Sequence, residues 1–598
     1  MLDPGTARTD VVLIEPPFAA INRPSLGLHL LQAIATREGI SVSVQYENLH
    51  LAAEFGEAAY QELCFLPTGF LVGERIFAHT AFGGNPRRLP DKAFEDKEAI
   101  RETSLKIRGK AHDVVRATAR RAVTTGARII GCTTTFEQTS FGLAVLKEVK
   151  AICPEVYTLL GGANCENPMG SAIFDISGWV DYVFSGESEA SFPLVLKQIL
   201  SGHPPKRKVV FGEPCMSLDA LPICRFDEYF QQLEELLPNS RMAEDNHIRV
   251  PMETSRGCWW GQKHHCTFCG LNGEGMSFRQ KSAKRAFDEL ISITRNVPVS
   301  KVFMTDNIMP HDYFSSLLKI LSKNCPTVDI FYEQKSNLSL QNFKDLRNAS
   351  VMEIQPGIEA LSSPLLVRMK KGVRASMNIR TLRYARSFGI TVSWNLLCGF
   401  PGDTVDEYAH LPSLLPLLSH LQPPGHFGHI SIDRFSPYFV DFESYGLENL
   451  RPIRSYGEVY PSEANLFDLA YHFEADYASA ITEDKALFKS IASLIEDWET
   501  KWSGDIYPPC LFVSDIDGDQ FILVDTREGT RGLAMRFISR ERAQTVLWRP
   551  ASDADRKWAL DIDAAVMLEG EYVPLATSTA GVLEALTDAR RAFLSEAI

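Results

Sequence analysis

Short apolar runs alternate with helical patterns through the first third of the chain, and this alternation constrains the fold more than any other feature. Each run ends in a turn before the next helical pattern begins. Strands at this spacing form βα units, which predict a parallel, doubly wound (Rossmann-like) sheet over residues 1–200. The expected elements are strands at Val11–Ile14, Ile40–Tyr46, Ala127–Cys132, Val156–Leu160 and Tyr182–Phe184, a helix at Leu26–Glu38, and a polar, helix-rich insertion over 50–125.

A second βα series begins near residue 251, after a loop-rich segment at 201–250 that we interpret as a connector. Six strands over about 180 residues fit an open, partial (β/α)6 barrel, because the eight-stranded version needs about 250 residues. We expect this barrel over residues 251–455. Its predicted strands are Pro251–Ser255, Val302–Thr305, Ile330–Glu333, Met352–Gly357, Val392–Leu397 and Ile430–Arg434.

The last part of the chain, residues 456–598, has a different pattern. A helical stretch over 463–501 precedes short strands, with Asp517-Gly518 as a turn signal between two of them. A short helix between the strand sets would make an α+β, winged-helix-like module. The whole chain is therefore predicted to be an α/β multidomain protein. The expected strands of the last module are Leu511–Val513, Gln520–Val524, Leu533–Ile538, Ala564–Leu568 and Tyr572–Leu575.

Composition narrows the partners and the compartment. The chain has 45% hydrophobic residues and 61 basic against 75 acidic side chains, a net charge of −14, so bulk attraction to nucleic acid or an anionic membrane is disfavoured. No apolar run approaches the roughly 20 residues of a membrane span, and the first residues lack the order of a secretory signal. We expect a cytoplasmic protein without nucleic-acid or membrane partners, in which clustered cysteines bind metal.

Three cysteines carry the strongest chemical signal. Cys258, Cys266 and Cys269 fall within twelve residues, directly after the first predicted barrel strand. A structural zinc site usually takes four protein ligands, with a second Cys/His pair further along the chain. Three thiolates on one loop suit a [4Fe-4S] cluster with one open iron. Zinc and unligated cysteines remain the alternatives.

The motif and its flanks resemble the radical S-adenosylmethionine (SAM) superfamily. The common spacing there is C-x3-C-x2-C, whereas this chain has C-x7-C-x2-C. The flanking segments 253–261 and 268–273 resemble one subgroup, the cobalamin-domain radical SAM enzymes that mature ribosomally made peptides and include C-methyltransferases. The resemblance implies that SAM chelates the open iron and that an electron from the cluster cleaves it to a 5′-deoxyadenosyl radical.

The resemblance also assigns polar residues at the carboxyl ends of the barrel strands to SAM. Active sites of such barrels lie at that end. Lys335 or Ser336 would hold the carboxylate of SAM, Glu359 a ribose hydroxyl, and the Phe268 backbone the adenine edge, while Arg434 would face SAM or substrate. The complete predicted set is Phe268, Gly270, Asp306, Glu333, Lys335, Ser336, Gln355, Glu359, Asn395 and Arg434.

The N-terminal sheet resembles a cobalamin-binding domain. Small residues after successive strands would let a nucleotide tail lie against the backbone, and ligands of such sheets bind beyond the carboxyl ends of the strands. The D-x-H-x-x-G motif is absent, and His29 is expected to pack or cap. We therefore infer base-off cobalamin without that histidine and leave the lower cobalt ligand open. The predicted contacts are Phe18, Thr133, Thr134, Thr135, Gly161, Gly162, Gly186 and Glu187.

These assignments imply a peptide C-methyltransferase. Through methylcobalamin and a 5′-deoxyadenosyl radical, it would methylate an unactivated sp3 carbon of a precursor peptide, with a flavodoxin or ferredoxin as reductant. The last module is a candidate for leader-peptide recognition by strand addition, or else a barrel-closing or dimerisation element. Two other functions stay open: a maturase with a cyclisation or rearrangement outcome, and a non-catalytic cobalamin or iron–sulfur sensor.

Overall fold

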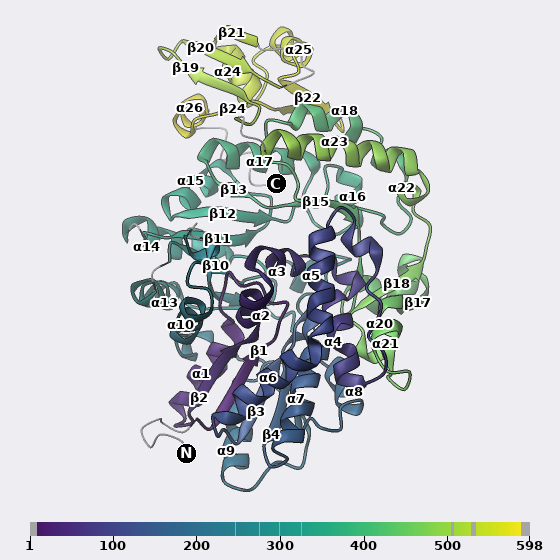
Figure 1. Cartoon of the computed structure of the whole chain (residues 1–598). Helices are drawn as coiled ribbons and strands as arrows, with labels where there is room; N and C mark the ends of the chain where they lie inside the picture. The colour runs from purple at the N-terminus through teal and green to yellow at the C-terminus, as the bar shows by residue number, and fades with distance from the viewer. Residues whose placement is uncertain are drawn as a thin grey trace.

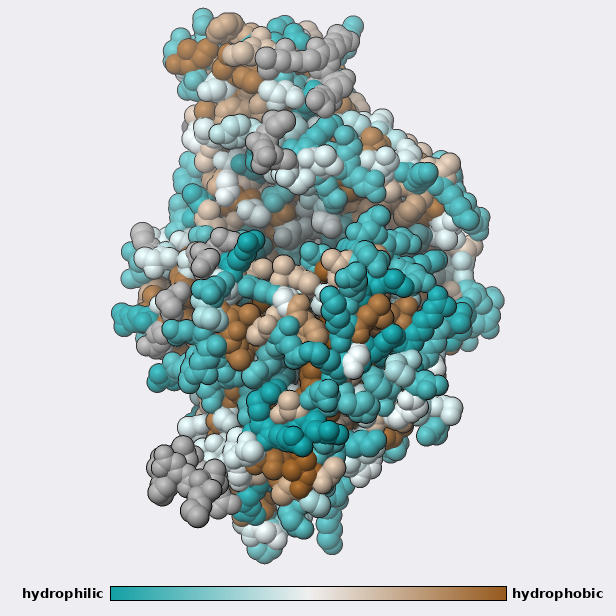
Figure 2. Space-filling model, viewed as in Figure 1, coloured by the Kyte–Doolittle hydropathy of each residue, from teal (hydrophilic) through white to brown (hydrophobic). Residues whose placement is uncertain are grey.

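The computed structural model describes residues 9–244, 247–273, 275–297, 299–324, 326–503, 507–527 and 534–587. Three parts follow one another along the chain: an N-terminal α/β domain, a barrel-like sheet with outer helices, and a smaller α+β module (Figure 1). The last module projects from the barrel as a narrower lobe, and the visible face of the molecule is largely hydrophilic (Figure 2). No helix in the described part is long and apolar enough to cross a bilayer.

The N-terminal domain is built on a six-stranded, fully parallel sheet in the order β2-β1-β3-β4-β5-β6. The chain order reverses between β1 and β3, and this switch point opens a crevice at the carboxyl ends of the strands. The predicted parallel sheet is thus confirmed. The segment 201–250 is more than a connector, because it supplies β6. The strands are β1 (Val11–Glu15), β2 (Val42–Tyr46), β3 (Ile129–Thr133), β4 (Tyr157–Gly161), β5 (Tyr182–Ser185) and β6 (Val209–Phe211).

Helices cover both faces of this sheet. The first, α1, buries Leu30 and Ile34 on one stripe and ends before Gly39, whose φ of 79° suits a residue without Cβ. The predicted insertion is a helical layer in which α4 packs against α7. The helices are α1 (Leu26–Arg37), α2 (Glu47–Phe55), α3 (Glu57–Leu63), α4 (Val72–Phe82), α5 (Glu98–Gly109), α6 (Ala111–Thr124), α7 (Thr139–Ile152), α8 (Met169–Asp175), α9 (Ser191–Leu200), α10 (Asp227–Leu236) and α11 (Arg241–Glu244).

The central part holds a five-stranded parallel sheet, β13-β12-β11-β10-β7, extended by the parallel pair β14–β15. An isolated parallel bridge from Glu359 to Leu396 links the two. The predicted strand Val392–Leu397 is broken at Ser393-Trp394. The strands are β7 (Val250–Met252), β10 (Lys301–Met304), β11 (Asp329–Gln334), β12 (Val351–Pro356), β13 (Thr391–Val392), β14 (Asn395–Cys398) and β15 (His426–His429).

The prediction of the sixth barrel strand at Ile430–Arg434 was wrong. The sixth parallel position is β15, a few residues earlier, and β16 (Ile432–Asp433) instead pairs antiparallel with β18 (His472–Asp476). β18 also pairs with β17 (Glu448–Pro452), so the predicted helical stretch 463–501 contains a strand. In both segments, antiparallel pairing with a strand elsewhere in the chain determines the secondary structure. The helices here are α12 (Gly261–His264), α13 (Ala283–Asn296), α14 (Leu317–Asn324), α15 (Leu340–Asn348), α16 (Ser363–Arg368), α17 (Ala375–Phe388), α18 (Leu411–Leu414), α19 (Pro437–Val440), α20 (Arg454–Val459), α21 (Leu466–Leu469), α22 (Ala480–Glu483) and α23 (Lys485–Ser503).

The last module contains a four-stranded sheet, β21-β20-β19-β24, and a β22–β23 hairpin. The predicted antiparallel strands and hairpin are present, while Leu533 lies outside the described residues. Two helices rather than one separate the strand sets. The elements are β19 (Leu511–Asp515), β20 (Gln520–Asp525), β21 (Ala534–Ser539), α24 (Arg540–Leu547), α25 (Asp553–Asp561), β22 (Ala565–Leu568), β23 (Glu571–Pro574), β24 (Thr577–Ser578) and α26 (Ala580–Leu586).

Candidate functional site

The cysteine loop starts where β7 ends, and a buried carboxylate fixes that start. Asp306, directly after β10, accepts hydrogen bonds from the Thr254 backbone N–H at 2.6 Å and the Ser255 hydroxyl at 2.8 Å. Burial raises the pKa of Asp306 to about 6, against the lowering effect of these hydrogen bonds. Asp306 was predicted to contact SAM, which stays a prediction; its fully buried carboxyl positions the loop.

The three thiols share one environment. The Gly261 N–H points at the Cys258 sulfur at 3.3 Å, and the Cys269 N–H donates to the Cys266 carbonyl at 3.1 Å. Burial and then the neighbouring thiols raise the pKa of Cys269 to about 11, despite a backbone hydrogen bond that lowers it. The thiols are therefore close enough to repel one another as thiolates, which a multi-iron cluster would relieve. The described residues contain no set of three or more His, Cys, Asp or Glu side chains that could hold a single metal ion.

Two lysines bring positive charge to the thiols. Burial and the neighbouring Lys371 lower the pKa of Lys335 to about 8, although Cys266 and Cys258 act in the opposite direction. Burial lowers the pKa of Lys371, but Glu359 and Cys266 outweigh it, so the net shift is upward. Lys371 pairs with Glu359 at 3.2 Å.

Sequence reasoning missed Lys371. It lies in the Lys370-Lys371-Gly372 turn between α16 and α17, and a Cβ on Gly372 would meet the Trp260 ring at 2.3 Å. A glycine preceded by two lysines directly after a barrel crossover helix was the available signal. The structure therefore adds Lys371 to the residues that surround the thiols.

Three predicted SAM residues lie on strands of the barrel. Glu333 of β11 and Gln355 of β12 are register partners, and Asn395 begins β14. Burial, followed by repulsion from Glu359 and Asp306, raises the pKa of Glu333 to about 7. Glu333 thus lies near Glu359, Asp306 and Lys371. The contact of Glu333, Gln355, Glu359 and Asn395 with SAM stays a prediction.

Other predicted SAM residues have structural contacts of their own. The Ser336 hydroxyl is buried and donates to Asn378 at 2.6 Å. The Arg434 guanidinium donates to the carbonyls of Ala470 and Phe467. The Arg434 backbone reaches the cysteine loop, since a Cβ on Gly270 would lie 2.2 Å from its carbonyl oxygen. The ring of Phe268 is 5.8 Å from the Lys371 ammonium.

The N-terminal sheet has a pocket at its switch point. It holds about 270 Å³ between the sheet and helices α1 and α9, and its wall is mainly apolar. Gly162, with φ of 99°, has no room for a Cβ, which would lie 2.4 Å from the Thr134 carbonyl oxygen. Five of the predicted cobalamin contacts line this pocket: Thr133, Gly161, Gly162, Gly186 and Glu187. Its apolar wall includes Leu13, Leu26, Leu30, Leu31, Leu159, Leu160, Phe184 and Phe192.

The remaining predicted cobalamin residues hold the loops around this pocket. The Thr134 hydroxyl donates to the Gly161 carbonyl at 3.1 Å. Thr135 forms a capping box with Gln138 at the start of the next turn. Phe18 packs beside Phe77, with ring centroids 6.0 Å apart. His29 is buried, and its ring nitrogens lie 2.8 Å from the Gln32 and Tyr46 oxygens, which confirms the expectation that it packs.

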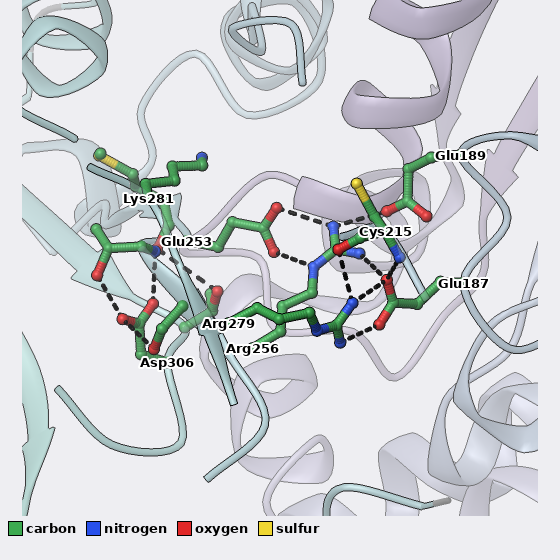
Figure 3. A network of polar contacts seen from close by, with 12 residues as sticks. Glu187, Glu189, Cys215, Glu253, Arg256, Arg279, Lys281 and Asp306 are labelled. Atoms are coloured by element: carbon green, nitrogen blue, oxygen red, sulfur yellow. Dashed lines mark hydrogen bonds and ion pairs between the residues drawn. The ribbon is translucent and has the colours of Figure 1, made fainter. Parts of the chain in front are cut away.

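A network of ion pairs joins the pocket to the cysteine loop (Figure 3). Arg256 of β8 (Ser255–Arg256) contacts Glu187 at 2.8 Å, Glu189 at 2.6 Å and Glu253 at 2.8 Å. Arg279 of β9 (Arg279–Gln280) contacts Glu187 at 2.5 Å. Hydrogen bonds and charges from both arginines hold the pKa of Glu187 below its usual value, although burial alone would raise it. Glu253 and Arg256 also line the pocket, so one segment serves both sites.

A buried carboxyl in the loop after β3 should make the stability of the protein depend on pH. Burial raises the pKa of Glu137 to about 8, and Oε1 has no hydrogen-bond partner among the described residues. The folded chain then keeps a proton that the unfolded chain loses near pH 4.5. This stabilisation is complete at low pH and lost as the pH rises through 8. Between pH 6 and 8 we expect a loss of about 2 kcal/mol.

Thermal unfolding of wild type and Glu137→Gln at pH 6 and pH 8 tests this expectation. The variant should lose less stability than the wild type on going to pH 8. Glu102→Gln, a change at an exposed carboxyl of α5, is the control and should follow the wild type. Parallel pH curves for wild type and Glu137→Gln would contradict the assignment.

Comparison with known proteins agrees with the geometry. Residues 252–415 match the family model of the Radical SAM superfamily. The hopanoid C-3 methylase of Methylococcus capsulatus is 25% identical over 273 residues, which cover 42% of this chain and 49% of that protein. The chain thus spans about half the length of this curated relative.

Solved structures have a similar fold at low sequence identity. OxsB, a cobalamin-dependent SAM radical enzyme solved with aqua-cobalamin and SAM, aligns with a TM-score of 0.54 and 11% identity over 98% of this chain and 79% of that one. TsrM from Kitasatospora setae, a radical SAM methyltransferase solved with cobalamin and a [4Fe-4S] cluster, gives 0.54 and 13% over 82% and 91%.

Fold and site together define a chain in which a parallel-sheet α/β domain is followed in sequence by a radical SAM domain. More particularly, its fold is that of the cobalamin-dependent radical SAM enzymes.

Proposed function

We propose that this protein is a cobalamin-dependent radical SAM methyltransferase that methylates an unactivated sp3 carbon of a ribosomally made precursor peptide. One observation carries the proposal. Residues 253–269 begin as a wall of the N-terminal pocket and end as three neighbouring thiols beside two lysines. The family match and the shared fold support the same assignment.

The residues present fit the three implied cofactors. Cys258, Cys266 and Cys269 would hold a [4Fe-4S] cluster, and the polar end of the barrel would hold SAM. The apolar, glycine-walled pocket suits the nucleotide tail of cobalamin. Cluster and SAM supply one-electron chemistry that activates a C–H bond, and cobalamin supplies the methyl group.

The protein's own side chains set the charge and order of the site. Lys335 and Lys371 favour the thiolate forms and attract a carboxylate. Glu359 balances Lys371 through its ion pair at 3.2 Å. Asp306 holds the loop in place through Thr254 and Ser255. These contacts keep the thiols in one position before any ligand arrives.

The peptide substrate rests on the resemblance of segments 253–261 and 268–273 and on the added α+β module. A small apolar substrate is the second candidate, favoured by the hopanoid methylase relative. A non-methylating radical outcome and a sensor role are the further alternatives. A flavodoxin or ferredoxin would supply the electron.

Anaerobic reconstitution separates these functions. The protein is loaded with iron, sulfide, SAM, cobalamin and a reductant, and then given a peptide encoded next to its gene. We expect release of 5′-deoxyadenosine and a mass gain of one methyl group on the peptide. Nucleoside release with an altered but unmethylated peptide would support cyclisation or rearrangement, and no nucleoside release would support a sensor.

A substitution in the pocket tests cobalamin binding without catalysis. Gly161 ends β4, and a Cβ there meets only Phe184 at an ordinary 3.7 Å. Gly161→Leu should therefore fold but place its side chain in the pocket and weaken hydroxocobalamin binding more than tenfold, measured by equilibrium dialysis. Gly109→Leu, at an open position on α5, should bind like the wild type. Equal affinity in the two variants would place the cobalamin elsewhere.

A further inference from the structure

A wide groove lies between barrel helix α17 and the last module. It is open to solvent and holds about 1120 Å³. Helix α17 forms one wall, with α24, β23 and the end of α26 opposite. The Arg383 guanidinium fixes these walls by donating to the Ala576 and Leu547 carbonyls at 2.7 to 2.9 Å.

This groove is positively charged in a chain of net charge −14. Its described lining has four arginines, Arg380, Arg383, Arg540 and Arg549, against one acidic residue, Glu571. Glu571 already accepts a hydrogen bond from Ser376 at 2.8 Å. Burial and the neighbouring Arg380 lower the pKa of Arg383 to about 10, with only Tyr384 and Tyr572 acting against them. Cationic side chains thus lie together with little negative charge nearby.

Two buried donors in the groove have no partner. The Arg380 Nε–H and the Trp548 Nε1–H are both inaccessible to solvent and make no hydrogen bond within the described residues. Arg540 donates to the Gly518 and Ala585 carbonyls, at 2.8 and 3.1 Å. Buried donors normally find acceptors, and carboxylates are the strongest acceptors for guanidinium groups. The guanidinium groups of the lining would therefore suit a ligand that carries carboxylates.

The groove also starts near the candidate site. Ser376 at its rim is four residues after Gly372, which packs on Trp260 of the cysteine loop. Four residues of chain span at most about 14 Å. A polypeptide in the groove would therefore begin close to the barrel opening.

We propose that this groove docks an acidic segment of the substrate peptide, with its carboxylates on Arg380 and Arg540. The proposal rests on the peptide substrate proposed above and adds where and by which charge that peptide is held. A single nucleic-acid strand also has acidic groups and would stack on Tyr384 and Trp548. The peptide is favoured because the overall negative charge of the chain repels a long polyanion.

Fluorescence anisotropy on the full chain tests the proposal. The probe is a fluorescein-labelled twelve-residue peptide in which Glu and Asp alternate with Leu and Ser. Its neutral match has Gln and Asn at the acidic positions. We expect the acidic probe to bind at least tenfold more tightly at low salt and to weaken as salt is raised. Arg380→Gln and Arg540→Gln should each weaken it about fivefold.

Arg542→Gln is the matched control. Arg542 is on the same helix as Arg540 but pairs with Asp555 outside the groove, so its binding should equal that of the wild type. Equal binding of acidic and neutral probes, or wild-type affinity in Arg380→Gln, would overturn the proposal. So would preferential binding of a twelve-nucleotide oligouridylate, or binding of the acidic probe only after removal of residues 588–598.

The binding test of the groove and the test of the proposed methylation can fail independently. If 5′-deoxyadenosine forms but the acidic probe shows no preference, the docking groove fails alone. If the probe binds as expected but no nucleoside is released, the proposed function fails while the groove remains an acidic-peptide site.

Discussion

Cys266→Ala is expected to abolish release of 5′-deoxyadenosine, with a loss of at least a thousandfold. Two remaining thiols leave the cluster without its third protein ligand, and SAM then lacks an ordered iron to bind. Cys266 is only partly buried, and removing one sulfur should leave the fold intact. Anaerobic assay of the reconstituted variant, together with iron and sulfide content, measures the effect.

The control for this variant is Cys153→Ala. Cys153 is also a partly buried free cysteine, but it follows α7 in the N-terminal domain. This variant should retain the iron content and nucleoside release of the wild type. Full activity in Cys266→Ala would remove the cluster assignment, and equal losses in both variants would point to general damage rather than to ligation.

Arg256→Met is expected to be the most destabilising single change in the interdomain network. Its guanidinium contacts three carboxylates and its side chain is only 16% exposed. Removing it leaves partly buried negative charges facing one another, which costs about 3 kcal/mol. For domains of this size that corresponds to a fall of about 6 °C or more in the unfolding midpoint. Cobalamin affinity should fall as well, because Arg256 and Glu187 line the pocket.

Arg451→Met supplies a close comparison. Arg451 also contacts two carboxylates, Glu474 and Asp476, at 3.0 Å each, but its side chain is 46% exposed. Water screens these pairs, so the change should cost less than about 1 kcal/mol. Calorimetry on Arg256→Met and Arg451→Met measures the two unfolding midpoints. Similar midpoints would show that the network at Arg256 adds no more than a surface pair.

The parallel sheets could be predicted from sequence because their strands are buried apolar runs. Val11–Glu15 and Tyr182–Ser185 are buried along their whole length, and such runs differ clearly from the loops around them. The short strand Ile432–Asp433 and the strand His472–Asp476 carry no such pattern. Their positions depend on antiparallel pairing with each other, which single-sequence periodicity does not report.

The residues of the candidate site also divide into those that the sequence could predict and those that it could not. The three cysteines could be found because their spacing is itself the signal. The roles of Asp306, Ser336 and Arg434 could not be read from sequence, because a polar residue at a strand end can face a ligand or hold a neighbouring loop. Here their side chains bond to the chain itself. Lys371 was missed because its neighbours in space come from three distant segments.

The ion pairs of Arg256 limit how freely the two halves of this protein can be exchanged. Domains joined by a plain linker can be recombined with new partners, since few contacts cross the boundary. Here Arg256, which completes the wall of the switch-point pocket, lies two positions before Cys258, the first cysteine of the loop. A chimera that kept the N-terminal sheet but took its barrel from a relative would need matching carboxylates and arginines at the join. We therefore expect the N-terminal sheet domain and the barrel to be inherited together.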